Sequence, residues 1–294
     1  MHLFVDNLIN VDFSYLDHKR GLVGETWLAS AALDGALDEQ GMVCDFGIVK
    51  KTLRNWLDSE LDHRLLVPLQ SAHLELQRSG DTLALTWQLE DGEQITVSGP
   101  EQAFALVDVE EISEQSVAAW CVGQLDSAFP SHVAKLQLRF DCEAIDDAYY
   151  HYSHGLKKHD GNCQRIAHGH RSRIQIFIDG RRSPDWESRW AQRWQDIYLG
   201  TREDLVSPEG LASAEHKAQK QVEFAYQARQ GAFTLGLPAS RCELVQCDTT
   251  VEQLAVYIAD TIANTIAAEQ EKGRIVRVRA YEGLGKGAEV SVSR

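Results

Sequence analysis

Residues 152–170 read Tyr152-Ser-His154-Gly-Leu and, after six further residues, Cys163-Gln-Arg-Ile-Ala-His168-Gly-His170. In a β-strand, residues i and i+2 point to the same face, so His168 and His170 would present their imidazoles side by side. His154, from a neighbouring strand, would complete a set of three nitrogens. Three protein nitrogens with an open fourth position are typical of a catalytic zinc, whereas four protein ligands normally close a structural zinc site. The stretch therefore predicts paired strands around a zinc site, with Cys163 free for chemistry.

Other interpretations of these residues exist. His151 and His159 lie near enough in the sequence to be ligands instead, and a lone buried histidine is usually a hydrogen-bonded core residue; three at this spacing favour ligation. Cys163 could be a small buried hydrophobic residue, an interpretation that fits Cys121 and Cys142 better than a thiol in a polar, basic loop. Beside a metal or cationic groups, Cys163 could act as a general base and acid that moves protons on a substrate side chain.

The overall composition is acidic, with one basic exception. The 294 residues carry a formal charge of −15 and a pI near 5.1, which argues against nucleic acid or an anionic membrane as a partner. Around the histidines the balance reverses, in a basic island of five residues with Asp160 as its one acid: Lys157, Lys158, Arg165, Arg171 and Arg173. The island predicts an anionic small substrate, and an exposed, solvated loop is the alternative explanation.

The cysteines and the N-terminus indicate a compartment. The six cysteines show no even framework, and the first residues lack the basic start and long apolar core of a signal peptide. No apolar run approaches the roughly 20 residues that span a bilayer. We therefore expect free thiols in a reduced, cytoplasmic protein without a membrane partner.

The pattern of strands and helices divides the chain into two related halves, residues 1–132 and 133–294. Alternating apolar residues predict strands over residues 82–89, 94–97, 133–140, 174–178 and 274–280, with a hairpin turn at Asp91-Gly92. Helical spacing predicts helices over residues 46–61, from about 113, after Ser183-Pro184, over about 208–230, and after Thr249-Thr-Val-Glu252, which matches a capping box.

With these residues laid out, the chain resembles the family of 6-pyruvoyltetrahydropterin and 6-carboxytetrahydropterin synthases, whose fold is the tunnelling fold, or T-fold. The first half keeps Gly41-Met-Val-Cys-Asp45-Phe46 and Leu61-Asp62-His63-Arg-Leu-Leu66. Where the metal motif belongs, that half has Phe13-Ser-Tyr-Leu-Asp17 and Gly24-Glu-Thr26. The second half keeps the remaining motifs, namely Tyr152-Ser-His154, Cys163, His168-Gly-His170, Thr250-Val-Glu252-Gln and Tyr281-Glu282-Gly.

The resemblance implies an α+β protein made of two tandem T-fold domains, with antiparallel sheets each packed by helices. It also implies that Zn²⁺ is bound in the second domain by His154, His168 and His170, and that the first domain holds no zinc. Each half retains what the other lacks. The divided motifs therefore predict one composite active site.

The same resemblance implies roles for five further residues. Cys163 would transfer protons together with His63, whose imidazole Asp62 would orient; the alternative is that Asp62 only caps the segment after the helix. Glu282 would anchor the pterin ring, because a carboxylate can accept two parallel N–H bonds from an aminopyrimidinone edge. A solvated carboxylate at the end of a strand is the alternative for Glu282. Glu252 would have a secondary role in substrate binding.

The implied substrate is 7,8-dihydroneopterin triphosphate, whose triphosphate the basic island could receive. The implied activity is that of a zinc-dependent 6-carboxy-5,6,7,8-tetrahydropterin synthase, a lyase that serves queuosine and 7-deazapurine synthesis. The alternatives are a 6-pyruvoyltetrahydropterin synthase, another dihydropterin side-chain lyase, or a non-catalytic protein that binds pterin or zinc. Because T-folds leave open sheet edges that are liabilities when unpaired, a homo-oligomer is expected.

Overall fold

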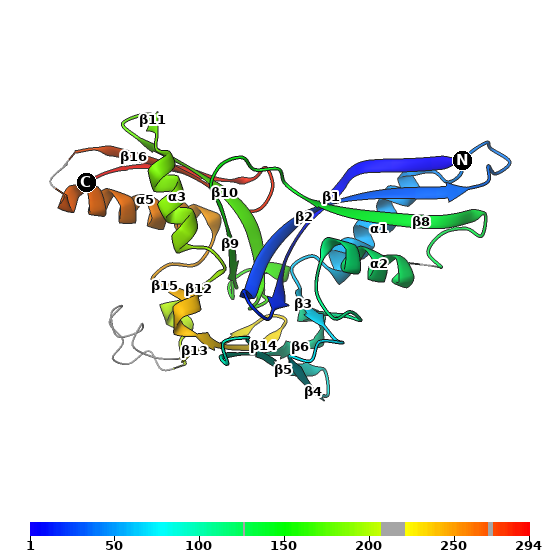
Figure 1. The fold of residues 1–294 in the computed structure, drawn as a ribbon, viewed down its shortest axis with the longest axis horizontal. Coiled ribbons are helices and arrows are strands. Elements are labelled where there is room, and N and C mark those ends of the chain that lie inside the picture. Colours follow the sequence, from blue (N-terminus) through cyan, green and yellow to red (C-terminus); the bar gives the residue numbers. More distant parts are fainter. Residues whose placement is uncertain (126, 207–220, 270–272) are drawn as a thin grey trace.

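The structure is a computed structural model that describes residues 1–125, 127–206, 221–269 and 273–294. The first of its three sheets is built on a long antiparallel hairpin of β1 (His2–Asp17) and β2 (Gly21–Gly35). The sheet order is β7-β3-β1-β2-β8, with β3 (Leu65–Pro68), β7 (Phe104–Val107) and β8 (Val133–Cys142). Figure 1 shows α1 (Phe46–Glu60) and α2 (Glu114–Gln124) along one side of this sheet.

The helices of the first half begin where the sequence predicts. The carboxylate of Asp45 accepts hydrogen bonds from the backbone N–H groups of Gly47 and Ile48, so it caps α1. Ser113 caps α2 through the N–H of Ser116. Both helices bury apolar side chains against the sheet in one hydrophobic core.

The second sheet repeats this plan in the second half. Its order is β15-β12-β9-β10-β16-β17, and β11 (Arg181–Arg182) pairs with β10. Its strands are β9 (Tyr149–His154), β10 (His168–Ile178), β12 (Ile197–Thr201), β15 (Cys242–Val245), β16 (Ile275–Tyr281) and β17 (Gly287–Ser293). Two helices, α3 (Pro184–Arg193) and α5 (Val251–Ala268), pack on it, and α3 begins at the predicted proline.

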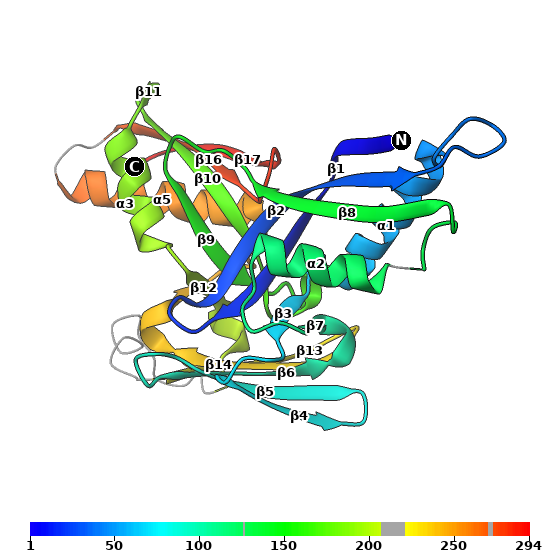
Figure 2. The same ribbon diagram turned by 45° about the vertical axis from the view of Figure 1, so that its right-hand side comes forward.

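A third sheet joins the two halves. β4 (Leu74–Ser79), β5 (Thr82–Gln88) and β6 (Gln94–Pro100) come from the first half, and the predicted hairpin at Asp91-Gly92 connects β5 to β6. β13 (Gln221–Ala228) and β14 (Gly231–Pro238) come from the second, and β14 pairs antiparallel with β6. Figure 2 shows this sheet below the other two, so the halves form one body with a shared core.

The two long hairpins also contact each other at the centre of the molecule. In the first hairpin Ser14 pairs with Gly24, and in the second Ser153 pairs with Gly169. The hydroxyl oxygens of the two serines lie 2.7 Å apart in a buried hydrogen bond. A Cβ on Gly24 would lie 1.9 Å from the Tyr152 carbonyl oxygen, so only glycine permits this approach. The two halves thus meet through equivalent positions.

Three sequence-based predictions need correction. The strand over residues 133–140, expected to open the second half, is β8, and it pairs with β2 of the first sheet. A boundary at 132/133 would cut that sheet, so the division falls between Cys142 and Tyr149, where β8 ends and β9 begins. Alternation identifies a strand but not its partner, which is why the sequence misplaced it.

The other two corrections concern helices. The sequence predicts a helix over about residues 208–230, but residues 221–228 form the strand β13. Residues 208–220 lie outside the described residues. The cap of α5 is Thr250, whose hydroxyl accepts from the N–H of Gln253, rather than the predicted capping box of Thr249 and Glu252. Thr249 is fully buried and makes other contacts, described below.

Candidate active site

Three buried histidines come together on the central hairpin of the second half. His154 on β9 is the register partner of His168 on β10, and His170 lies two residues further along β10. Their exposed fractions are 0%, 1% and 1%. One ring nitrogen from each histidine lies within 4.8 Å of the others. The period of two along a strand therefore places His168 and His170 together, as the sequence predicts.

The hydrogen bonds of these rings leave nitrogens available for a metal. The Nδ1 of His154 lies 2.9 Å from the Thr249 hydroxyl, and the Nδ1 of His168 donates to the Arg165 carbonyl oxygen at 3.0 Å. Among the described residues, the Nε2 atoms of His154 and His170 lack a hydrogen-bond partner, and the Nδ1 of His170 lies 3.2 Å from the Asp12 carboxylate. Because an unpaired polar atom in a core is costly, the two unpaired Nε2 atoms, together with the nearby ring of His168, fit a zinc ion.

The protonation states agree with ligation. Burial lowers the pKa of His154 well below its usual value, and the neighbouring His170 and His63 lower it further. Burial and His154 lower the pKa of His168 in the same way. Both rings are therefore neutral near pH 7, which is the form that binds a metal.

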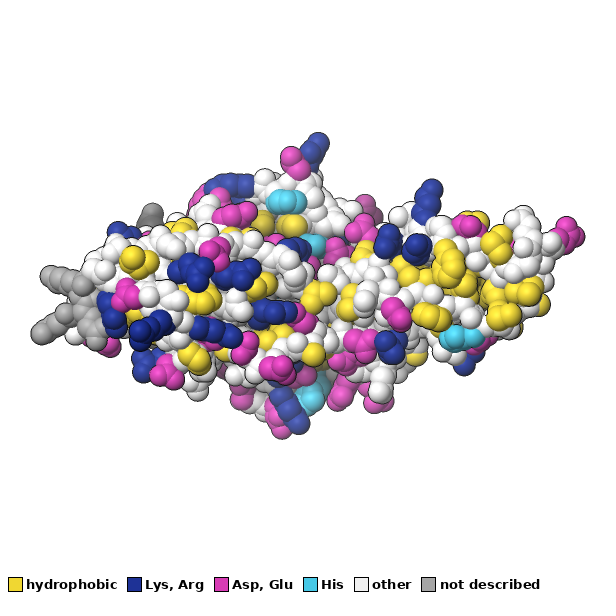
Figure 3. Space-filling model, turned by 90° about the horizontal axis from the view of Figure 1, so that it is seen from above, with side chains coloured by type: hydrophobic (Ala, Val, Ile, Leu, Met, Phe, Trp, Pro, Cys, Tyr) yellow, Lys and Arg dark blue, Asp and Glu magenta, His cyan; other side chains and the backbone are white. Residues whose placement is uncertain are grey.

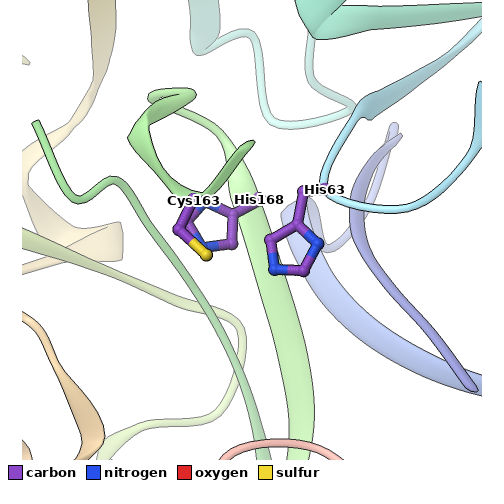
Figure 4. A group of neighbouring side chains, drawn as sticks. All are labelled: His63, Cys163 and His168. Atoms are coloured by element: carbon purple, nitrogen blue, oxygen red, sulfur yellow. The ribbon is translucent and has the colours of Figure 1, made fainter. Parts of the chain in front are cut away.

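Cys163 and His63 lie beside this cluster. Cys163 is partly buried in a short 3₁₀ turn (Asn162–Gln164) between β9 and β10. Figure 4 shows its thiol and the His168 ring together, with the His63 ring opposite them. Ligand atoms of all three residues lie within 4.8 Å of one another. A thiol and an imidazole from different halves of the chain thus face the same space.

Asp62 and His63 follow α1 in the first half. The Nδ1 of His63 lies 2.5 Å from the Asp62 carboxylate, a contact that restricts the orientation of the ring. His63 has a φ of 55°, a left-handed conformation that is uncommon for residues other than glycine. Burial acts to lower the pKa of His63, but hydrogen bonds to Asp62 and Cys163 outweigh it and raise the pKa to about 10. The ring is therefore a cation near neutral pH in the metal-free chain.

Arg165 supplies a further buried cation at this junction. Its guanidinium donates to the carbonyl oxygens of His63 at 3.3 Å and of Asp62 at 3.5 Å, and its side chain bonds Gln230 at 3.1 Å. It is 5% exposed, and burial lowers its pKa to about 10. Arg165 thus ties the loop that carries Cys163 to the segment that carries His63.

Glu282 follows β16 and reaches the histidine cluster, whereas Glu252 does not. A carboxylate oxygen of Glu282 lies 3.9 Å from the Nε2 of His170, and its side chain is 23% exposed. Glu252 is exposed on the first turn of α5, where it lines a surface groove with Val256 and Tyr257. Of these two predicted carboxylates, Glu282 is therefore the one placed to meet a ligand at the cluster within one chain.

The basic island does not form a single anion site. Lys157 pairs with Asp204 and Glu203, and Lys158 pairs with Asp248. Arg171 donates to the Glu143 carbonyl oxygen, and Arg173 pairs with the Glu143 carboxylate. Acids distant in the sequence pair with Lys157, Lys158 and Arg173, which local sequence could not reveal. Of the five, Arg165 is the one beside His63.

The two histidines ranked below the ligands have other roles. The Nδ1 of His151 donates to the Gly24 carbonyl oxygen at 2.8 Å, and the Nδ1 of His159 accepts from the N–H of Gly161. The sequence analysis missed three residues that support the site, namely Asp12, Thr249 and Lys286. Asp12 and Thr249 contact the histidines, and Lys286 contacts Asp12. All of these contacts are with residues distant in the sequence, so local sequence offered no signal for them.

Comparison with known proteins decides the family. The model of the family described as 6-pyruvoyl tetrahydropterin synthase matches the chain twice, over residues 11–139 and 145–292. The chain belongs to this family. It contains two tandem copies of the family's T-fold, as the divided motifs predict. The α+β class is likewise confirmed, with antiparallel sheets packed by helices.

Solved structures of the family resemble parts of the chain. A catalytic-residue mutant of 6-pyruvoyltetrahydropterin synthase from Plasmodium vivax is 20% identical, with a TM-score of 0.38, and the match covers 48% of this chain and 97% of that one. The enzyme from Plasmodium falciparum is 18% identical, with a TM-score of 0.37, and the match covers 48% of this chain and 90% of that one. A comparison with curated proteins gave no match.

The helices of the described residues were also compared with the requirements of a membrane span. None of them is both long enough and apolar enough to cross a bilayer.

Proposed function

We propose that the chain is a zinc-dependent lyase of the 6-carboxy-5,6,7,8-tetrahydropterin synthase type, which acts on 7,8-dihydroneopterin triphosphate. One observation carries the proposal: Asp62 and His63 of the first half meet Cys163 and the three histidines of the second half within a single chain. The parts of one reaction centre are therefore assembled from two incomplete copies of the family fold.

The histidines His154, His168 and His170 would hold the zinc through their Nε2 atoms. The bound ion would supply Lewis acidity toward the two side-chain hydroxyls of the substrate. Every proton transfer falls to the chain's own groups. Cys163 accepts a proton from the substrate side chain, and His63, held by Asp62, exchanges a proton on the opposite side. These transfers would allow loss of the triphosphate and, with addition of one water molecule that supplies the second carboxylate oxygen, release of a two-carbon fragment as acetaldehyde.

The pterin ring would be held at the edge of the cluster. Glu282 has a partly exposed carboxylate that can accept two parallel N–H bonds from the aminopyrimidinone. Arg165 supplies positive charge next to His63 for an anionic substrate. The product would feed the queuosine and 7-deazapurine route.

We further propose that the protein works as a homo-oligomer in the cytoplasm. In the described part of the chain, β8 and β17 are edge strands with one pairing side unused. Figure 3 shows hydrophobic side chains gathered on the sheet of the first half, where Phe4 is 60% exposed. Both features favour pairing with further copies. The six cysteines are all free thiols, which suits a reducing compartment.

The test is a product analysis. Zinc-loaded protein is incubated with 7,8-dihydroneopterin triphosphate, and the products are identified by mass. A carboxytetrahydropterin together with acetaldehyde is the expected result. A pyruvoyl product would instead support the 6-pyruvoyltetrahydropterin synthase alternative. Absence of turnover with an intact zinc site would support a non-catalytic, pterin-binding role.

A further inference from the structure

Asp12 is a buried carboxylate of the first half that faces the metal cluster of the second half. It lies on β1, and its side chain is 6% exposed. Its Oδ1 lies 3.2 Å from the Nδ1 of His170 and accepts a hydrogen bond of 2.5 Å from the Thr26 hydroxyl. Its Oδ2 lies 3.2 Å from the Nζ of Lys286. Since a buried carboxylate is costly unless it is paired, these three contacts account for its presence.

The main chain of Asp12 holds the other half of the site. Its N–H donates to the Asp62 carboxylate at 2.8 Å, and its carbonyl oxygen accepts from the N–H of His63 at 2.6 Å. These two bonds fix the left-handed turn that carries His63. Asp12 therefore contacts the metal ligand through its side chain and the proton-transfer pair through its backbone.

The loop that follows β16 packs on the same carboxylate. A Cβ on Gly283 would lie 2.4 Å from the Oδ1 of Asp12, so glycine is required for this approach. Lys286 lies 3.8 Å from the Glu282 carboxylate as well as 3.2 Å from Asp12. The position of Glu282 is thus coupled to Asp12 through Gly283, the next residue in the loop, and through Lys286.

We propose that Asp12 is a positioning residue that fixes His170 for the metal and holds the parts of the composite site from both halves in register. The inference rests on the proposed function. A carboxylate beside the Nδ1 of a ligating histidine fixes the ring's tautomer and raises its basicity, so that Nε2 faces the metal. Here that carboxylate comes from the half of the chain that carries no histidine cluster. Zinc binding in the second half therefore depends on the first.

The test compares zinc affinity in the full-length chain and its Asp12→Asn variant, by competition with a chelator. Asparagine keeps the size and the backbone bonds to Asp62 and His63 but removes the charge beside His170. We expect zinc affinity to fall by about 10–100-fold, which is the usual effect of losing such a partner. We also expect turnover, lost at low zinc, to return when zinc is added in excess.

His151→Asn is the matched control. His151 lies two residues before Ser153, as Asp12 lies two residues before Ser14, and it is also buried where the halves meet. Its loss is expected to leave zinc affinity unchanged. If Asp12→Asn fails to fold, Thr26→Val removes the hydroxyl that donates to Asp12, and it is expected to weaken zinc binding in the same direction.

The outcomes separate the two proposals. Equal zinc affinity in the wild-type and Asp12→Asn proteins overturns the role of Asp12 and leaves the proposed function standing. A loss of turnover that excess zinc does not restore also overturns this role, because it indicates general damage. A wild-type chain that binds no zinc overturns the proposed function, and the role of Asp12 with it.

Discussion

His63 and Asp196 occupy equivalent positions in the two halves of the chain. Each has a φ of 55°. His63 lies two residues before Leu65, the strand partner of Ser14, and Asp196 lies two residues before Tyr198, the strand partner of Ser153. The fold thus repeats the unusual turn that presents His63, but in the second half the turn presents a carboxylate.

The surroundings of Asp196 form a closed counterpart of the candidate active site. Arg20 donates two hydrogen bonds to its carboxylate, at 2.6 and 3.0 Å, and another to the Tyr15 hydroxyl. By the same strand register, Tyr15, Val23 and Glu25 stand where the second half has His154, His168 and His170. An ion pair and packed side chains therefore fill the place that a metal would need.

Because one composite site has three converging histidines and its counterpart has Tyr15, Val23 and Glu25 at the equivalent positions, we predict one zinc per chain. His168→Ala should lower zinc affinity more than about 100-fold, since loss of a ligand exceeds the usual effect of losing a partner of a ligand. Metal analysis after dialysis against a weak chelator measures this. His132→Ala, at a histidine bonded to the Val43 carbonyl oxygen outside the cluster, is the control. A His168→Ala protein with full zinc and full activity contradicts the ligand assignment.

Cys163→Ala should abolish turnover and keep the zinc. The thiol lies beside the histidine cluster but is not needed for ligation, so its loss should cost about 10²–10⁴-fold in kcat, the usual contribution of a general acid or base. Activity and metal content are measured on the same sample. Cys247→Ala, at a thiol that is also partly buried, serves as the control. Normal kcat in Cys163→Ala would remove the thiol from the mechanism.

His63→Asn should likewise lower kcat with little change in zinc affinity. Asparagine tolerates the left-handed backbone at this position better than alanine does, so the substitution tests the imidazole rather than the turn. We expect a loss of about 10²–10⁴-fold in kcat. Steady-state kinetics at saturating zinc make the measurement. A variant with wild-type kcat would show that the first half does not contribute the catalytic imidazole.

Glu25 should make stability depend on pH. Burial raises its pKa from 4.5 to about 7, so the folded chain keeps a proton that the unfolded chain releases, and its contribution to stability falls as pH rises through this window. Burial lowers the pKa of the adjacent His151 from 6.5 to about 4, and its contribution to stability rises with pH. From about pH 4.5 to 6.5, the two slopes oppose each other.

Glu25→Gln removes the carboxylate whose contribution to stability falls as pH rises. Relative to the wild-type chain, the variant should gain about 1.4 kcal/mol of unfolding free energy per pH unit between pH 4.5 and 7, up to about 3 kcal/mol in total. Urea unfolding of both proteins at several pH values tests this. Glu75→Gln on exposed β4 provides the control. A difference between variant and wild type that stays constant with pH would falsify the prediction.

Gly169→Ala should destabilise the junction between the halves. A Cβ there would lie 2.4 Å from the Tyr152 carbonyl oxygen and 2.6 Å from the Gly24 Cα, so backbone must shift. We expect a loss of roughly 3 kcal/mol, at the upper end for overpacking, and weaker zinc binding because His168 and His170 flank the glycine. Gly123→Ala, on α2 with open space around it, should instead stabilise by about 0.5–1 kcal/mol. Equal effects in the two variants, measured by urea unfolding, would rule out steric contact as the cause.

The sequence by itself determined the local elements and the shared face of the metal ligands. The spacing of His168 and His170 needs only the two-residue period of a strand to bring their rings together. Asp45, Ser113 and Pro184 mark helix starts through bonds or dihedral angles within a few residues, so they too were predicted. The family motifs, divided between the two halves, added the T-fold, and the family model matches both halves.

Only the tertiary structure decided which distant residues meet. Arg165 donates a hydrogen bond to the carbonyl oxygen of His63, 102 residues away in the sequence. β8 pairs in the first sheet, although its alternating pattern would also suit a strand of the second sheet. Asp12 could not be predicted as a site residue from the sequence, because its partners His170 and Lys286 lie in the other half of the chain. Strand periods and caps are set by neighbours along the chain, whereas the composite site is set by how two folded halves bury their hairpins against each other.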